Sequence, residues 1–132
     1  MTEHGRAADD VLDEHHLRQM TLGDQSLERE VLQVFARQIT LMLKRIARAE
    51  PPHAAAAAHT LKGSARGLGA WRVAEAAEQL EQAATGLGNL SEAIAELEIA
   101  ANEVCGAIET RLQGAATETV ALYGHASFYP AA

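Results

Sequence analysis

The stretch Ala54–Gly69 reads Ala-Ala-Ala-Ala-Ala-His-Thr-Leu-Lys-Gly-Ser-Ala-Arg-Gly-Leu-Gly, and its apolar residues repeat with the period of an α-helix. At about 100° per residue, with His59 set at zero, one stripe between about 160° and 260° collects Ala54, Ala57, Ala58, Leu61, Ala65 and Leu68. A stripe of this width is typical of a helix packed on other helices. His59 lies on the opposite face, so we expect its side chain to point outward.

The neighbours of His59 on the same helical face share small size or positive charge. Within about 60° of it lie Lys62, Gly63, Arg66, Ala55 and Ala56. A glycine inside a helix costs about 1 kcal/mol relative to alanine, and this cost suggests that Gly63 is kept small for an interface. We therefore expect an imidazole on a smooth, mildly positive surface over which a large partner could dock.

The composition favours a helical protein of one domain. A chain of 132 residues is long enough for one domain with a real core, but not for two. Apolar residues make up 48% of the chain and aromatic residues only 4%. Much of the apolar share is alanine, which favours closely packed helices over sheets. We therefore expect an all-α fold.

Charge and cysteine content narrow the classes of function. A formal net charge of -7 argues against nucleic-acid binding, because a phosphate backbone rewards a basic surface. The single cysteine, Cys105, excludes an internal disulfide and a cysteine-based zinc site. No apolar run approaches the roughly 18 residues of a membrane span, and Met1–Asp13 lacks the order of a signal peptide. We expect a soluble, cytoplasmic protein that binds a protein partner, with no membrane contact.

Helix signals divide the rest of the chain. We expect a flexible lead-in over residues 1–8 and then a short helix, capped by Asp9 or Asp10, that ends near Gly23. Four long amphipathic helices follow, each with apolar residues three and four apart. The first runs from a cap at Asp24 to about Ala49, the second from Pro51-Pro52 to Gly67 and Gly69, the third from Trp71 to about Thr85, and the last from Leu90, after a cap at Asn89, to Leu112. After Gly114 the helical pattern fails.

These lengths and connections predict the architecture. Long helices joined by two to five residues run antiparallel to their neighbours. We predict an all-α, antiparallel, up-down four-helix bundle with the short N-terminal helix across one end. The expected organisation is a flexible N-terminus over 1–8, the bundle over 9–113 and a C-terminal tail over 114–132.

One motif resembles the histidine-containing phosphotransfer (HPt) domain of bacterial phosphorelays: His59-x-x-Lys62-Gly63-Ser64-Ala65, followed by Leu68-Gly69 and then by Leu80-Glu81. The likeness runs from Leu12 to about Leu112 and extends to the order and lengths of the helices. It implies a phosphocarrier, whose histidine accepts a phosphoryl group from an aspartyl phosphate of one receiver domain and passes it to the aspartate of another.

The resemblance also implies roles for particular residues. His59 would be the phosphoacceptor, Lys62 the cation near the phosphoryl group, and Gly63 the position kept small so that the receiver can approach. The surface that binds the partner would also include Arg66, Ala55 and Ala56. Some members of the family hold the imidazole with a glutamine of the next helix, and three side chains compete for that role here: Gln79, Glu81 and Gln82.

The expected partners are response-regulator receiver domains and a histidine kinase, which could be a hybrid kinase. The resemblance implies no cofactor bound to this chain, because the receiver would bring its own Mg²⁺. Gly67-Leu68-Gly69 lacks the strand and lysine context of a phosphate-binding loop, so we expect no ATP site. We expect the protein to be a monomeric carrier and not an enzyme. Two alternatives stay open, a helical adaptor that is never phosphorylated and, less favoured, an autophosphorylating kinase fragment.

Overall fold

The computed structural model describes residues 11–123, with side chains as far as Gly114, and this part of the chain is helical without strands. Its helices are α2 (Glu14–Met20), α3 (Gln25–Arg48), α4 (Pro51–Leu68), α5 (Trp71–Ala84) and α6 (Leu90–Tyr123). None of these helices combines the length and the apolar character that crossing a bilayer requires. The predicted all-α class is confirmed.

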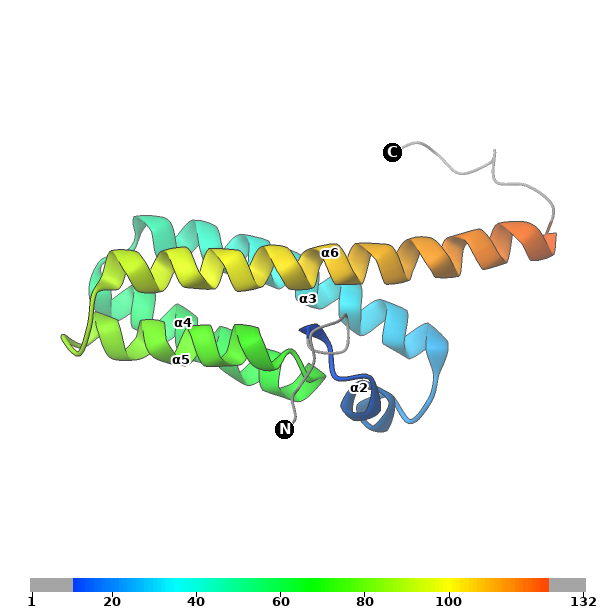
Figure 1. Cartoon of the computed structure of the whole chain (residues 1–132), viewed down its shortest axis with the longest axis horizontal. Coiled ribbons are helices and arrows are strands. Elements are labelled where there is room, and N and C mark those ends of the chain that lie inside the picture. Colours follow the sequence, from blue (N-terminus) through cyan, green and yellow to red (C-terminus); the bar gives the residue numbers. More distant parts are fainter. Residues whose placement is uncertain (1–10, 124–132) are drawn as a thin grey trace.

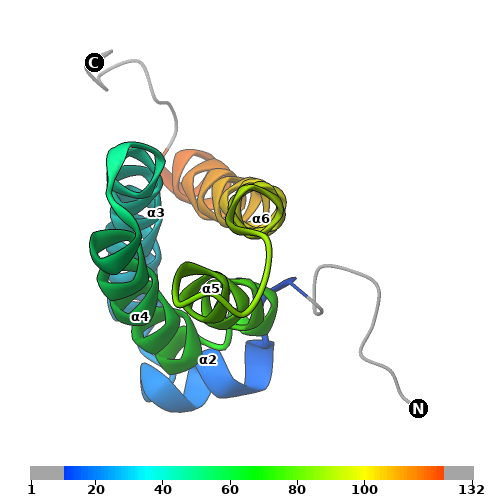
Figure 2. The ribbon, with the colours of Figure 1, turned by 90° about the vertical axis from the view of Figure 1, so that its left-hand side faces the viewer.

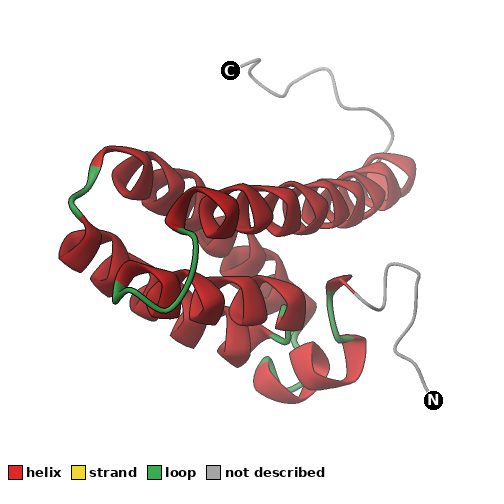
Figure 3. Cartoon of the chain, turned by 60° about the vertical axis from the view of Figure 1, so that its left-hand side comes forward, coloured by secondary structure: helices red, strands yellow, loops and turns green. Residues whose placement is uncertain are grey.

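The four long helices form a closed bundle. α4 packs on α3 and α5, and α6 closes the ring by packing on α5 and α3. Figure 2 shows these four helices around a common centre, with α2 across one end, where it packs on α4. Short loops join successive helices, which therefore alternate in direction (Figures 1 and 3). The predicted antiparallel bundle is confirmed.

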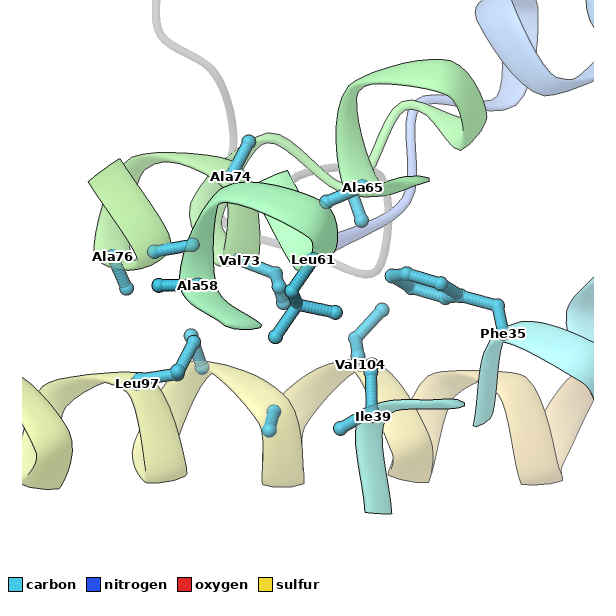
Figure 4. Packing of buried hydrophobic residues seen from close by; sticks show 14 of the residues in the cluster. Phe35, Ile39, Ala58, Leu61, Ala65, Val73, Ala74, Ala76, Leu97 and Val104 are labelled. Carbon is cyan, nitrogen blue, oxygen red and sulfur yellow. The ribbon is translucent and has the colours of Figure 1, made fainter. Parts of the chain in front are cut away.

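The core lies between all four long helices. Leu61 of α4 is fully buried, and around it gather Phe35 and Ile39 of α3, Val73 of α5 and Val104 of α6 (Figure 4). The buried stripe of α4 consists of Ala54, Ala58, Leu61, Ala65 and Leu68. Ala57, expected in the same stripe, is only partly buried. Alanine at most of these positions lets the neighbouring helices approach α4 closely, and this contact positions the outward face of α4.

Several predicted helix ends are confirmed. The Asp24 side chain accepts a hydrogen bond from the backbone N–H of Leu27 at 3.0 Å, which caps α3. The Asn89 side chain accepts from the N–H of Glu92 at 3.0 Å at the start of α6. These side chains satisfy backbone donors that have no partner within the first turn of a helix.

Gly69 ends α4 for two physical reasons. Its φ of 84° lies in the left-handed region that glycine adopts without strain. A Cβ at this position would also lie only 2.9 Å from the Cβ of Asp13. The expectation that Gly67 shares this role is wrong, because Gly67 lies inside α4. One glycine costs a helix about 1 kcal/mol, which is not enough to end it.

The N-terminal helix is shorter than predicted. α2 begins at Glu14, and its cap is Asp13, whose side chain accepts a hydrogen bond from the backbone N–H of His16 at 3.1 Å. The predicted caps, Asp9 and Asp10, and the lead-in over residues 1–8 lie outside the described residues. A tertiary contact holds Asp13 in place as the cap, because its side chain also accepts a hydrogen bond from Trp71 Nε1 of α5 at 2.9 Å.

The last helix is longer than predicted. α6 continues through Gly114 to Tyr123, so residues 114–123 are helix and not the start of a separate tail. Gly114 is followed by Ala115 and Ala116, and alanine favours helix strongly enough to offset one glycine. Figure 1 shows this end of α6 projecting beyond the rest of the bundle. The remainder of the predicted tail, 124–132, lies outside the described residues.

Candidate functional site

His59 lies midway along α4 on the face turned away from the core. Its side chain is 69% exposed, and its Nδ1 atom lies 2.8 Å from Oε2 of Glu81 on α5. The two residues are 22 positions apart in the chain, so the packing of α4 on α5 brings them together. The imidazole is thus open to a large partner while one ring nitrogen is held.

Glu81 also binds the cation of the motif. Lys62 Nζ lies 2.7 Å from Oε1 of Glu81, while His59 uses the other carboxylate oxygen. Residues three apart on a helix share a face, which allows His59 and Lys62 to reach the same carboxylate. The Lys62 side chain is 15% exposed and that of Glu81 is 25% exposed. This group of three side chains, His59, Lys62 and Glu81, is called the His59 triad below.

The carboxylate of Glu81 is ionised at neutral pH. Partial burial raises its pKa, but the hydrogen bonds and charges of Lys62 and His59 outweigh burial and hold the pKa below the ordinary value of 4.5. An ionised carboxylate can only accept hydrogen bonds. Nδ1 of His59 therefore carries a proton and donates a hydrogen bond to Glu81. In the neutral ring the lone pair is therefore on Nε2, the nitrogen that can act as a nucleophile.

The three candidates for holding the imidazole differ in position. Glu81 contacts His59. Gln79 lies instead in a groove between α5 and α6, where Arg72 and Glu96 also line the surface. Gln82 is exposed on α5, and the hydrogen bond that His59 makes within the described part of the chain goes to Glu81. The structure thus separates residues that the helical pattern of α5 could not rank.

The small residues around His59 leave its surroundings open. A Cβ added at Gly63 would meet no heavy atom within 4 Å among the described residues, apart from its own helix and chain neighbours. Packing within this part of the chain therefore does not require a glycine at this position. Ala56 is exposed and Ala55 is partly buried. Because each side chain is a single methyl group, neither obstructs a partner beside the imidazole.

Arg66 lies one turn further along α4 and is engaged elsewhere. Its guanidinium lies 3.2 Å from Oε1 of Glu78, and both side chains are exposed. Exposed ion pairs of this kind contribute little and are easily exchanged for another partner. The structure therefore pairs Arg66 with Glu78 and not with a member of the triad.

A groove of about 720 Å³ runs between α3 and α4 on the Gly63 side of His59. We call it the Gly63 groove, and its lining includes Gly63, Gly67, Val34 and Met20. Val34 is 55% exposed and Met20 is 46% exposed. Sequence reasoning missed Val34 as a surface residue of this groove. A signal was present, because Val34 is apolar and lies outside the core stripe of α3.

The described side chains offer no metal site, since they include no group of three or more potential ligands placed to hold an ion. Compared with known families, the chain matches the one described as Hpt domain over residues 16–121. No curated protein and no solved structure matches the chain. The matched range contains the whole His59 triad and continues into the part of α6 beyond Gly114.

Proposed function

The chain belongs to the Hpt domain family, which implies histidine phosphotransfer in phosphorelays, and we propose that His59 is its phosphoacceptor. The observation that carries this proposal is the hydrogen bond between His59 Nδ1 and Glu81, which leaves Nε2 with a lone pair on an exposed ring. A nucleophile needs this combination of accessibility and a defined protonation state.

The proposed reaction is reversible phosphoryl transfer between two side chains. Nε2 of His59 attacks the phosphorus of an aspartyl phosphate on a receiver domain. An N–P bond forms, the P–O bond to the aspartate breaks, and the aspartate leaves as a carboxylate. The same steps in reverse pass the phosphoryl group to a second receiver. Nδ1–H stays hydrogen-bonded to Glu81 throughout, so the positive charge that forms on the ring is balanced by a carboxylate.

Lys62 is proposed to partner the phosphoryl group once it arrives. Its ammonium is held 2.7 Å from Glu81 before transfer, one turn of helix from His59. An incoming phosphoryl group carries more negative charge than the carboxylate alone and offers new acceptor oxygens. Before transfer, the Glu81 carboxylate therefore balances the positive charge of Lys62 on the same face of α4 as His59.

The receiver is proposed to supply the rest of the site. Phosphoryl transfer depends mostly on positioning and on charge neutralisation by a metal ion and cations. We expect the metal ion to be the receiver's own Mg²⁺. Gly63, Ala55, Ala56 and the Gly63 groove would accept the receiver's surface, with Arg66 at its edge. We propose a monomeric cytoplasmic carrier between a histidine kinase or hybrid kinase and a response regulator.

The proposal is tested by phosphotransfer from receiver domains of the host, phosphorylated beforehand and supplied with Mg²⁺. We expect acid-labile, base-stable label on this chain that disappears in His59→Gln. The matched control is His15→Gln, which changes an exposed histidine of α2 and should keep the label. No label from any receiver would favour an adaptor that binds receivers without being phosphorylated. Label from ATP alone would indicate a kinase fragment.

A further inference from the structure

α3 carries no acidic residue after its first turns. Residues 31–49 contain no aspartate or glutamate but include Arg37, Lys44, Arg45 and Arg48, in a chain whose formal net charge is -7. Of these cations, Lys44, Arg45 and Arg48 are all exposed. No ion pair joins any of these three to another of the residues that the structure describes.

These three cations meet at a groove. A depression of about 750 Å³ between the C-terminal half of α3 and the start of α4 is lined by Lys44, Arg45, Arg48 and His53. We call it the basic groove. Leu41, which is 57% exposed, and Met42 form an apolar part of its wall, and Glu50 is its one acidic lining residue. The groove thus offers several cations beside a surface that can also accept apolar side chains.

The basic groove is continuous with the proposed phosphoacceptor surface. Ala56 and Thr60, which flank His59 on α4, both line it. The groove therefore begins beside the imidazole and extends toward the start of α4, whereas the Gly63 groove extends toward the end of α4. A partner that covers His59 would cover the near end of both grooves.

The cations of the groove are not part of the His59 triad. Among the described residues, the ion pairs of the triad join Glu81 to His59 and to Lys62. Lys44, Arg45 and Arg48 lie at the same end of the bundle as His53. What they can contact is the surface of the docked protein beside its phosphoacceptor pocket.

We propose that the basic groove binds an acidic patch at the edge of the receiver domain docked over His59, and so selects which receivers bind and in which orientation. This inference rests on the proposed function and adds the partner chemistry that it leaves open. The two grooves differ in charge. The Gly63 groove is lined by one cation and one carboxylate, Arg37 and Glu30, whereas the basic groove is lined by three cations and one carboxylate. A receiver with carboxylates on one side of its pocket would therefore fit in one orientation only.

A protein surface suits the groove better than a nucleic acid. The cations form one small patch on a chain of net charge -7, and the remaining surface would repel an extended phosphate backbone. The apolar wall formed by Leu41 and Met42 also favours a folded partner with side chains of mixed character. Charge complementarity of this kind raises the association rate and discriminates between similar partners more than it raises affinity.

The test reverses charges in the groove and compares them with a matched pair outside it. Arg45→Glu/Arg48→Glu is set against Arg18→Glu/Arg29→Glu, which makes the same change in net charge at exposed arginines on the far side of α3 and on α2. The measurements are kcat/KM for phosphotransfer from the fastest receiver, and its Kd, at about 50 mM and 300 mM salt. Phosphorylation of His59 by phosphoramidate, which needs no receiver, controls for an intact site.

We expect the groove variant to lose about tenfold or more in kcat/KM at low salt and to show a flatter salt dependence. The control pair should change by about twofold or less, and Arg45→Lys/Arg48→Lys should keep near-normal transfer because it keeps the charge. All variants should react normally with phosphoramidate.

Equal losses in both charge-reversed pairs, or no loss in either, would overturn the inference. The proposed function would still stand in that case, provided that the wild-type protein accepts the phosphoryl group. Absence of wild-type transfer from every receiver would overturn both. Tight binding of a short DNA duplex that the groove variant abolishes would assign the groove to nucleic acid instead.

Discussion

The carboxylate of Glu81 joins His59 and Lys62: its Oε2 accepts a hydrogen bond from His59 Nδ1 at 2.8 Å, and its Oε1 forms an ion pair with Lys62 Nζ at 2.7 Å. Each partner uses its own carboxylate oxygen, so neither displaces the other. A single side chain on α5 thus keeps the imidazole proton on Nδ1 and also fixes the position of the Lys62 ammonium.

Replacing Glu81 with alanine should slow phosphotransfer by about tenfold or more, because the ring loses the acceptor that keeps its proton on Nδ1. The ¹⁵N shifts of His59 should show a smaller share of the Nδ1–H tautomer. Glu78→Ala is the control, since it removes a glutamate of the same helix that pairs with Arg66. An unchanged tautomer together with unchanged transfer would remove Glu81 from the proposed mechanism.

Replacing Lys62 with methionine should slow transfer or shorten the lifetime of the phosphohistidine, because the nearest cation is lost. It should also lower the free energy of unfolding by about 1 kcal/mol, since the partly buried Glu81 carboxylate loses one of its two partners. Denaturant unfolding and the decay of ³²P label measure the two effects. Lys62→Arg keeps the charge and should be milder in both. Normal transfer and lifetime in Lys62→Met would show that Lys62 serves only the fold.

Replacing Gly63 with glutamine should impair transfer from a receiver without lowering stability. A Cβ at this position meets no heavy atom of the other described residues within 4 Å, and loss of a mid-helix glycine can raise stability by up to about 1 kcal/mol. The thermal midpoint and kcat/KM are the measurements. Gly106→Gln is the matched control, because Gly106 is an exposed helical glycine of α6 with equally open surroundings. If both variants transfer normally, the partner does not approach Gly63.

The contribution of Glu81 to stability should depend on pH in a defined direction. Its pKa is lowered in the folded protein, because the bonds from Lys62 and His59 outweigh the opposing effect of burial. The stabilisation is therefore fully present above about pH 4.5 and is lost as the pH falls through the lower, folded-state pKa. We expect the stability difference between wild type and Glu81→Gln to be constant near neutral pH and to shrink below pH 4.5. A difference that grows on acidification would contradict the sign.

Replacing Gly69 with alanine should destabilise the fold by about 2 kcal/mol, because alanine would need both a left-handed backbone and space taken by Asp13. The control is Gly23→Ala, where φ is also positive at 77° but a Cβ meets nothing within 4 Å. That change should cost only about 1 kcal/mol from backbone strain. Denaturant unfolding compares the two. Equal losses would show that the contact with Asp13 gives way without cost.

Local signals in the sequence were enough for most of the fold. Asp24 and Asn89 each cap a helix as predicted, and the apolar stripe of α4 lies in the core. Such features depend on residues within one or two turns of each other, so the helical period reveals them. The prediction failed at Gly67 and Gly114, where a single glycine was taken as a helix end. Its cost is small beside the packing and propensity of the surrounding helix.

The sequence by itself determined that His59 lies on the outward face of its helix among small residues, because the 3.6-residue period opposes it to the buried stripe. Only the tertiary structure decided which side chain meets the imidazole. Gln79, Glu81 and Gln82 are neighbours in the sequence but point in different directions, and the rotation of α5 against α4 turns Glu81 toward His59. That rotation is set by buried contacts such as Leu80 and Ala77, which join residues of different helices. The two grooves beside His59 arise in the same way, from the contact of α3 with α4, and no single helix contains them.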